Sequence, residues 1–328
     1  MSPDCRQNLA PWLIACLTLF AVGVISPPAM AVTKAATTMD LPSAKIPTGH
    51  PWEDLAFPDV RMTSPFWSGV QRATGMTWMS RLLAQRILTQ AVAPVIDGPV
   101  KLKLSSFSAS DLLHGRVKQL RINGDDLTLE PSLPLDRLSV VSDDHYPLYI
   151  DNLKRPVLMR PIRLSIDATV TEKDFNRYLA SKDGLATMQR IKIPIPPFNK
   201  PQYVDVLAPK VDFKHNRVYF AGKLKLSDQE EKQAFPFALE AAPIPHGTQI
   251  QLNDVHLDVD GLRNTRPLER FMEDFLWEAL DLSKLRVDRH RLAVYYKTVS
   301  ATEDKLRLQA VVFVRPDNTN LKRMMKAK

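Results

Sequence analysis

Alternation of apolar and polar residues with a period of two recurs along most of this chain and constrains its fold more than any other feature. An alternating strand has one buried face and one solvated face, which is typical of antiparallel sheets and excludes a doubly wound parallel sheet. We expect strands over 101–104, 117–122, 127–129, 162–166, 204–206, 218–220, 223–226, 250–252, 255–259, 292–296 and 306–311. The Asn-Gly-Asp-Asp sequence at 123–126 favours a turn, so the second and third runs are expected to form a hairpin.

Three segments show the helical period instead. From residue 70 to 93, apolar residues recur every three or four positions, and Pro94 ends the pattern. A helix of this length measures about 36 Å, and because more than half of its circumference is apolar, we expect other elements to wrap around it. A second, shorter helix is expected over 171–184, and Pro267 lies in the first turn of a third, amphipathic helix that ends near Leu280. The fold class is therefore α+β.

The N-terminal region has the pattern of an export signal. Residues 13–25 contain no charge, which suits a signal-peptide core and is too short for a bilayer-crossing helix of about 20 residues. The Ala-Met-Ala sequence at 29–31, with small residues at its first and third positions, supplies a cleavage site, and the alternative is an uncleaved anchor. Both cysteines, Cys5 and Cys16, lie in this segment, so the exported domain contains no thiol and no disulfide.

This pattern divides the chain into four parts and predicts its location. We expect a signal peptide (1–31), a linker or loosely attached arm rich in Thr, Pro and Ala (32–65), a single domain (66–315) and a basic tail (316–328). The predicted location is the periplasm or cell envelope, with membrane association through the tail. The pattern does not specify an oligomeric state.

Motifs for catalysis, metals or cofactors are missing from the sequence. No two glycines are closer than six positions, so neither a dinucleotide fingerprint nor a phosphate-binding loop is present. The seven histidines stand alone, without the spacing that places two imidazoles on one metal, and no Gly-x-Ser-x-Gly motif occurs. We therefore expect no enzyme activity, no metal and no cofactor. The alternative is a hydrolase assembled from distant residues, in which His114 or His256 would contact an acid.

The formal net charge of +8 has two interpretations. Nucleic-acid binding requires basic and aromatic residues on one face, and export makes that partner improbable, so we predict none. Attraction to an anionic lipid surface fits better, because the densest basic cluster lies in the C-terminal tail. We name Lys322, Arg323, Lys326 and Lys328 as the contact residues, and the alternative is a solvated C-terminus.

One stretch is more specific than these patterns. Residues 110–124 contain an apolar pair, a glycine and then an alternating strand that ends in a second glycine, and this resembles the opening of the LmeA-like family of exported phospholipid-binding domains. Residues 170–179 and 250–257 resemble a later strand-to-helix segment and strand of that family, and the resemblance covers about 86–282. It implies the tubular lipid-binding fold, in which a strongly curved antiparallel sheet wraps a long helix beside an apolar channel for acyl chains. The family carries no catalytic motif over to this chain, and the 194–201 stretch and the tail match nothing in it.

The leading hypothesis is a non-enzymatic envelope protein that binds or carries phospholipid. Acyl chains would bury their methylene groups, at about 0.8 kcal/mol each, against side chains of the first and third helices. These are Trp78, Met79, Leu82 and Leu83, together with Phe271, Met272, Phe275 and Leu276. The alternative for each residue is an ordinary core position. The alternative function is an envelope scaffold or accessory subunit that binds a protein partner through its sheet and helix.

Overall fold

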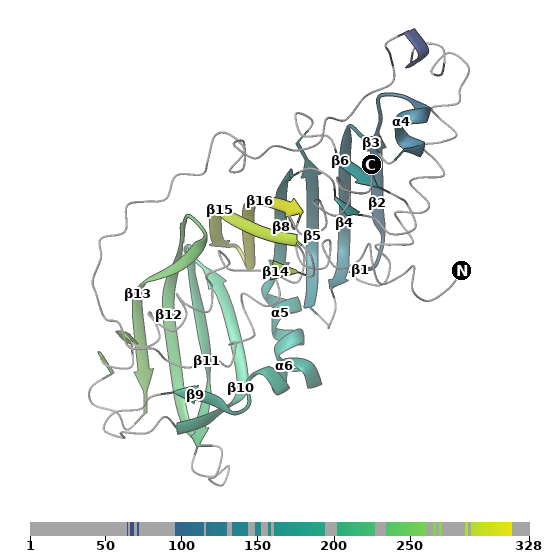
Figure 1. The fold of residues 1–328 in the computed structure, drawn as a ribbon. Helices are drawn as coiled ribbons and strands as arrows, with labels where there is room; N and C mark the ends of the chain where they lie inside the picture. Colours follow the sequence, from purple (N-terminus) through teal and green to yellow (C-terminus); the bar gives the residue numbers. More distant parts are fainter. Residues whose placement is uncertain are drawn as a thin grey trace.

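Antiparallel β-sheet forms most of the structure (Figure 1). The computed structural model describes residues 64, 66–68, 71, 96–114, 116–129, 133–143, 148–151, 157–158, 161–193, 202–226, 234–260, 265–266, 269–270, 286–287 and 290–316. Within these residues the strands form two large sheets and a small one, accompanied by short helices. The predicted antiparallel organisation is confirmed. The long helix predicted over 70–93 and the helix predicted from Pro267 lie almost entirely outside the described residues.

The first sheet has the strand order β1-β4-β5-β8-β16-β15-β14, and β2 pairs with β4 beside β1. Its strands are β1 (Ile96–Asp97), β2 (Val100–Ser105), β4 (Gln119–Leu129), β5 (Leu133–Ser142), β8 (Ile162–Thr171), β14 (Arg286–Val287), β15 (His290–Thr302) and β16 (Lys305–Pro316). Near β2 lie the short helix α4 (Ala109–Leu113) and the small sheet of β3 (Arg116–Val117), β6 (Leu148–Asp151) and β7 (Val157–Leu158). The pairing of β8 with β16 joins segments about 140 positions apart, for example Asp167 with Gln309.

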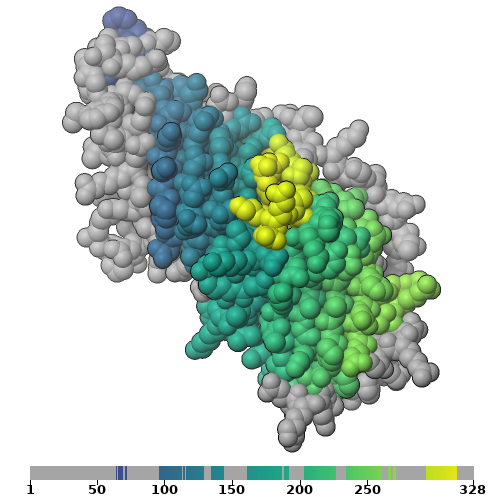
Figure 2. Space-filling view, turned by 180° about the vertical axis from the view of Figure 1, so that it is seen from behind, coloured from purple at the N-terminus to yellow at the C-terminus, as the bar shows by residue number. Residues whose placement is uncertain are grey.

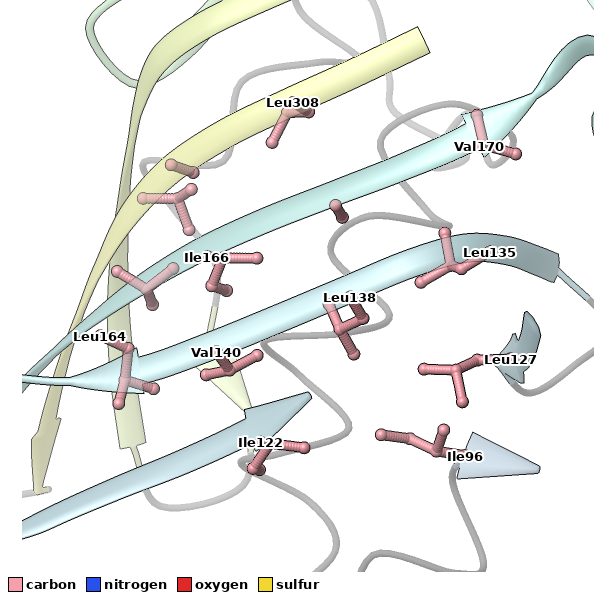
Figure 3. Packing of buried hydrophobic residues seen from close by; sticks show 14 of the residues in the cluster. Ile96, Ile122, Leu127, Leu135, Leu138, Val140, Leu164, Ile166, Val170 and Leu308 are labelled. Carbon is pink, nitrogen blue, oxygen red and sulfur yellow. The ribbon is translucent and has the colours of Figure 1, made fainter. Parts of the chain in front are cut away.

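One face of the first sheet forms the main hydrophobic core. Figure 3 shows side chains from several neighbouring strands on this face, among them Ile122, Leu138 and Leu164. Each of these three side chains is at most 1% exposed. Burial of one such side chain contributes about 1.5–3 kcal/mol, so this face supplies much of the stability of a domain without disulfides. On the opposite face Arg307 donates two hydrogen bonds to the carboxylate of Asp167, and these bonds lower the pKa of Asp167.

The predicted turn at 123–126 is wrong, because β4 continues through it as one strand. The register pairs Asp125 with Arg137 and then Leu127 with Leu135, so each strand skips one residue that has no partner in the pairing. The skipped residue of β4 is Asp126, which has a positive φ of 53°, a conformation that Asp tolerates better than most residues. The Asn-Gly-Asp-Asp sequence therefore forms an irregularity within a strand pair instead of a hairpin end.

Two short helices follow β8 and lead the chain to the second sheet. Instead of one helix over 171–184, the structure has α5 (Glu172–Leu179) and α6 (Lys182–Thr187). The Thr171 hydroxyl accepts a hydrogen bond from the Asp174 amide at the start of α5, as the capping pattern predicts. Ser181 caps α6 in the same way by accepting from the amide of Gly184. A second capping residue within the predicted segment thus divides it into two helices.

Gly184 is required by the tight junction between these helices. A Cβ at this position would overlap the carbonyl oxygen of Tyr178. We expect Gly184→Ala to lower the free energy of unfolding by about 1–3 kcal/mol, because the backbone must shift to admit the methyl group. Urea denaturation followed by circular dichroism measures this loss. Ala186→Ser, at an exposed position of α6, is the control, and equal losses in the two variants would contradict the prediction.

The second sheet has the order β13-β12-β11-β10-β9. Its strands are β9 (Ile191–Ile193), β10 (Gln202–Lys214), β11 (Arg217–Leu226), β12 (Phe235–His246) and β13 (Gln249–Val259). Asn176 of α5 holds β10 to the helix, because its side-chain amide donates to the Val211 carbonyl and accepts from the Val211 amide, both at 2.7 Å. This side chain satisfies the backbone of β10 just after a bulge in its pairing with β11.

The hairpin ends of the second sheet meet the first sheet at β15 and at the turn between β15 and β16. The amide of Asn216 donates to the carbonyl of Ala301 at 2.7 Å, and the amide of Tyr296 donates to the carbonyl of Gly247 at 2.8 Å. In the space-filling view β16, in yellow, lies where the two sheets adjoin (Figure 2). The other ends of β10 to β13 lie away from this junction (Figure 1).

Candidate ligand-binding face

Strand register places apolar side chains of four neighbouring strands on one face of the second sheet, here called the inner face. Val206 of β10 pairs with Leu224 of β11, and Leu224 pairs with Phe235 of β12. Paired residues of antiparallel strands point to the same side, so the pairing identifies the whole set. The inner face carries Val204, Val206, Val211, Phe213, Val218, Phe220, Leu224, Leu226, Phe235, Phe237, Leu239, Ala241, Leu257 and Val259.

Burial of the inner face differs from strand to strand. On β10 the inner-face residues are buried along the whole strand, from Phe213 at 2% exposed beside the junction to Val204 at 2% exposed at the other end. On β11 Phe220 and Leu224 are half-buried, and Phe235 at the start of β12 is 51% exposed. Val206, Phe237, Leu239 and Leu257 form a second, smaller apolar cluster. The inner face is therefore closed along β10 and partly open around Leu224 and Phe235.

A glycine shapes the middle of this face. Phe220 and Phe237 make an edge-to-face contact with ring centroids 5.4 Å apart. Phe237 pairs across the strands with Gly222, where a Cβ would lie 3.1 Å from the Phe237 ring and 3.0 Å from the Leu207 carbonyl. Any larger residue at 222 would push the ring outward, so the glycine lets Phe237 lie close to the backbone of the sheet.

The opposite face of the second sheet, the outer face, is polar. Lys225 and Asp205 form an ion pair of 3.4 Å, and Arg217 pairs with Glu240. Tyr219 donates a hydrogen bond to Glu240, and desolvation together with this carboxylate raises the pKa of Tyr219. The two faces thus separate chemically. The outer face is polar and carries ion pairs, and the inner face is apolar.

Comparison with known proteins identifies the ligand class of the family. Residues 77–310 match the family model described as LmeA-like phospholipid-binding. The chain belongs to the LmeA-like phospholipid-binding family. The match includes all of the second sheet and most of the first, in agreement with the resemblance carried by residues 110–124. Comparisons with curated proteins and with solved structures gave no significant match.

The lining residues predicted for this LmeA-like chain are not in the described part of the structure. Trp78, Met79, Leu82, Leu83, Phe271, Met272, Phe275 and Leu276 all lie outside the described residues, as do the signal segment and the basic residues of the tail. They stay predictions. The inner-face residues were not predicted as a site, although the alternation at 218–226 and 255–259 is visible in the sequence and indicates which side chains share a face.

The two histidines considered for hydrolysis lie away from the inner face. His256 is on the outer face, opposite Glu240 in the register, and its side chain is 76% exposed beside Glu269 at 3.8 Å. His114 is exposed at the end of α4. Over the described ranges, no group of three or more His, Cys, Asp or Glu side chains is arranged to hold a metal ion. None of the helices described has the length and apolarity needed to cross a membrane.

Proposed function

We propose that this protein is an exported, non-enzymatic phospholipid-binding protein of the cell envelope that holds acyl chains against the inner face of the second sheet. The observation that carries the proposal is the apolar surface that this face leaves exposed around Leu224 and Phe235. Val206 is 5% exposed, whereas its direct neighbour Leu224 is half-buried and Phe235, the next residue across the strands, is 51% exposed. Family membership supplies the ligand class.

The dimensions and chemistry of this face suit one acyl chain. From Phe220 to Leu226 the strand extends about 20 Å, at about 3.3 Å per residue. One leaflet occupies about half of a hydrocarbon core that is about 30 Å thick, so an acyl chain of one leaflet fits along this strand. Each methylene group removed from water there contributes about 0.8 kcal/mol. The headgroup would remain near the open end, where Phe235 is exposed.

Lipid analysis of the purified protein tests this proposal. The full chain is expressed with its own signal segment, purified from the envelope fraction under non-denaturing conditions, and examined by native mass spectrometry and by solvent extraction. We expect bound phospholipid in the native spectrum and transfer of labelled phospholipid between vesicles. Protein that carries no phospholipid and transfers none would contradict the proposal. Release of a hydrolysed lipid product would contradict its non-enzymatic part.

A further inference from the structure

An aromatic pair is exposed at one extremity of the molecule. Phe66 and Trp67 are 73% and 59% exposed, and their rings make an edge-to-face contact with centroids 5.8 Å apart. They belong to the short helical segment 66–68, here called the tip, which Figure 2 shows in purple at one end of the molecule. Large aromatic side chains this exposed are adapted to an environment other than water alone.

The tip is held in a defined position on the fold. Its third residue, Ser68, is 6% exposed, and the amide of Ser68 donates to the carbonyl of Ser64 at 3.0 Å. Gln71, three positions further, donates to the Ser110 hydroxyl at 3.2 Å and accepts from the Ser110 amide at 3.1 Å. Ser110 belongs to α4, so the tip lies beside α4, above the end of β2 (Figure 1). The aromatic pair thus points outward from an anchored segment.

Basic side chains follow the sheet edge that leads to the tip. Lys103 of β2 and Arg121 of β4 are directly opposite each other and both exposed, and Lys101 lies two positions along β2. Lys118, also exposed, lies where β2 runs toward α4, with its ammonium group 6.0 Å from the Phe107 ring centroid. We call these four residues the basic strip. Within the described part of the chain, none of them forms an ion pair.

The acidic residues of the same edge are displaced away from the tip. Like charges directly across two strands destabilise a sheet, so folding does not account for Lys103 opposite Arg121. Asp125 lies four residues beyond Arg121 in the direction away from α4, which is about 13 Å and exceeds the screening length of about 8 Å at physiological salt. Asp97 and Asp126 lie in that same direction. The edge is therefore positive near the tip and negative far from it.

We propose that the tip and the basic strip together form a docking surface for an anionic phospholipid bilayer. Phe66 and Trp67 would enter the interface between headgroups and acyl chains, which is the position that amphipathic aromatic rings favour. The basic strip would lie over the anionic headgroups, while the aspartates stay beyond the range of attraction or repulsion. This inference rests on the proposed phospholipid function and adds where the protein collects or delivers its ligand. It concerns residues separate from the C-terminal tail and from the inner face.

Sedimentation with vesicles tests the docking surface. The full chain is mixed with vesicles of equal parts phosphatidylglycerol and phosphatidylcholine, and with vesicles of phosphatidylcholine alone, at physiological salt. We expect stronger partition onto the anionic vesicles and weaker partition as salt is raised. Lys103→Gln with Arg121→Gln should lower anionic partition about 25-fold, because each cation near such a surface contributes roughly fivefold. Phe66→Ser with Trp67→Ser should lower partition onto both kinds of vesicle about tenfold or more.

A matched control removes the same charge elsewhere. Lys173→Gln with Lys182→Gln changes two exposed lysines of α5 and α6 and should leave partition unchanged. Equal losses in the control pair and the strip pair, or unchanged partition in both the strip and tip variants, would overturn the proposal.

Dissociation of a dimer in the tip variant, seen by analytical ultracentrifugation without loss of vesicle binding, would identify a second copy of the chain as the occupant and also overturn it. Bound phospholipid is quantified in the same samples. Wild-type protein without bound phospholipid contradicts the proposed function. Wild-type protein that contains phospholipid but does not partition onto anionic vesicles contradicts the docking surface alone.

Discussion

Replacing Phe213 by alanine is expected to lower the free energy of unfolding by about 3–5 kcal/mol, the range typical of a buried phenylalanine. Phe213 is 2% exposed and packs against Phe175 of α5 with ring centroids 6.0 Å apart. Its amide donates to Glu172, and its carbonyl accepts from Asp304 in the turn between β15 and β16. The residue therefore joins α5, the second sheet and the first sheet at one point, and removal of its ring leaves a cavity where these three parts meet.

Urea denaturation of the full chain, followed by circular dichroism, measures this loss. Phe235→Ala is the matched control, because it removes the same side chain from the same sheet at a position that is 51% exposed. We expect the control to lose less than about 1 kcal/mol. Similar losses in the two variants would show that Phe213 does not connect the sheets in the way its contacts indicate.

A pair of glutamates on the open part of the inner face is expected to abolish phospholipid retention. Leu224 and Phe235 are direct neighbours in the strand register, and both retain exposed surface, so carboxylates at these positions can remain hydrated in the folded protein. An acyl chain bound over these positions would desolvate two carboxylates. This desolvation costs more free energy than burial of the acyl chain contributes. For Leu224→Glu with Phe235→Glu we expect at least a tenfold loss of bound phospholipid, equivalent to about 1.4 kcal/mol or more.

The control for this variant carries the same two charges on the other side of the same strands. Ala221 and Ala238 also face each other directly and are exposed on the outer face. Ala221→Glu with Ala238→Glu should keep the lipid content of the wild-type protein. Phe235→Glu alone, at the most exposed position, provides a milder variant if the double substitution impairs folding. Equal lipid content in the inner-face and outer-face variants would exclude the inner face as the binding surface.

The strands that alternate strictly were predictable, and those that interrupt the alternation were not. The predicted runs at 101–104, 162–166 and 306–311 lie within β2, β8 and β16. In β5 the inward residues Leu135 and Leu138 are three positions apart, because the strand skips a residue opposite Asp126. This skip removes the period of two, so β5 was missed.

A second strand, β12, was not predicted because it contains prolines. β12 contains Pro236, Pro243 and Pro245, which lack the amide that a central strand needs for pairing on both sides. The structure accommodates the last two because β11 pairs with β12 only as far as Ala241, and the remainder of β12 pairs with β13 alone. The extent of a neighbouring strand is a tertiary property, and the proline pattern gives no indication of it.

The position of the candidate site shows the same limit. Period and hydrophobicity indicate that Phe220 and Leu224 share a face, and they indicate the same for Leu164 and Ile166 of β8. Leu164 and Ile166 are buried in the core, whereas Phe220 and Leu224 remain half-buried. Because both sets have the same sequence pattern, the difference depends on what packs over them. Prediction of lining residues from helical periodicity alone therefore passed over this part of the second sheet.

By itself the sequence determined the antiparallel organisation, the family, and the side chains that share a face, because strand period and motif spacing are local properties of the chain. Only the tertiary structure decided that the inner face is sealed near Phe213 and open near Phe235, since burial depends on elements brought together from distant parts of the chain. It also decided that Trp67 and Lys103 belong to one end of the molecule. That placement depends on the hydrogen bonds between Gln71 and Ser110, which are 39 positions apart and which no local pattern encodes.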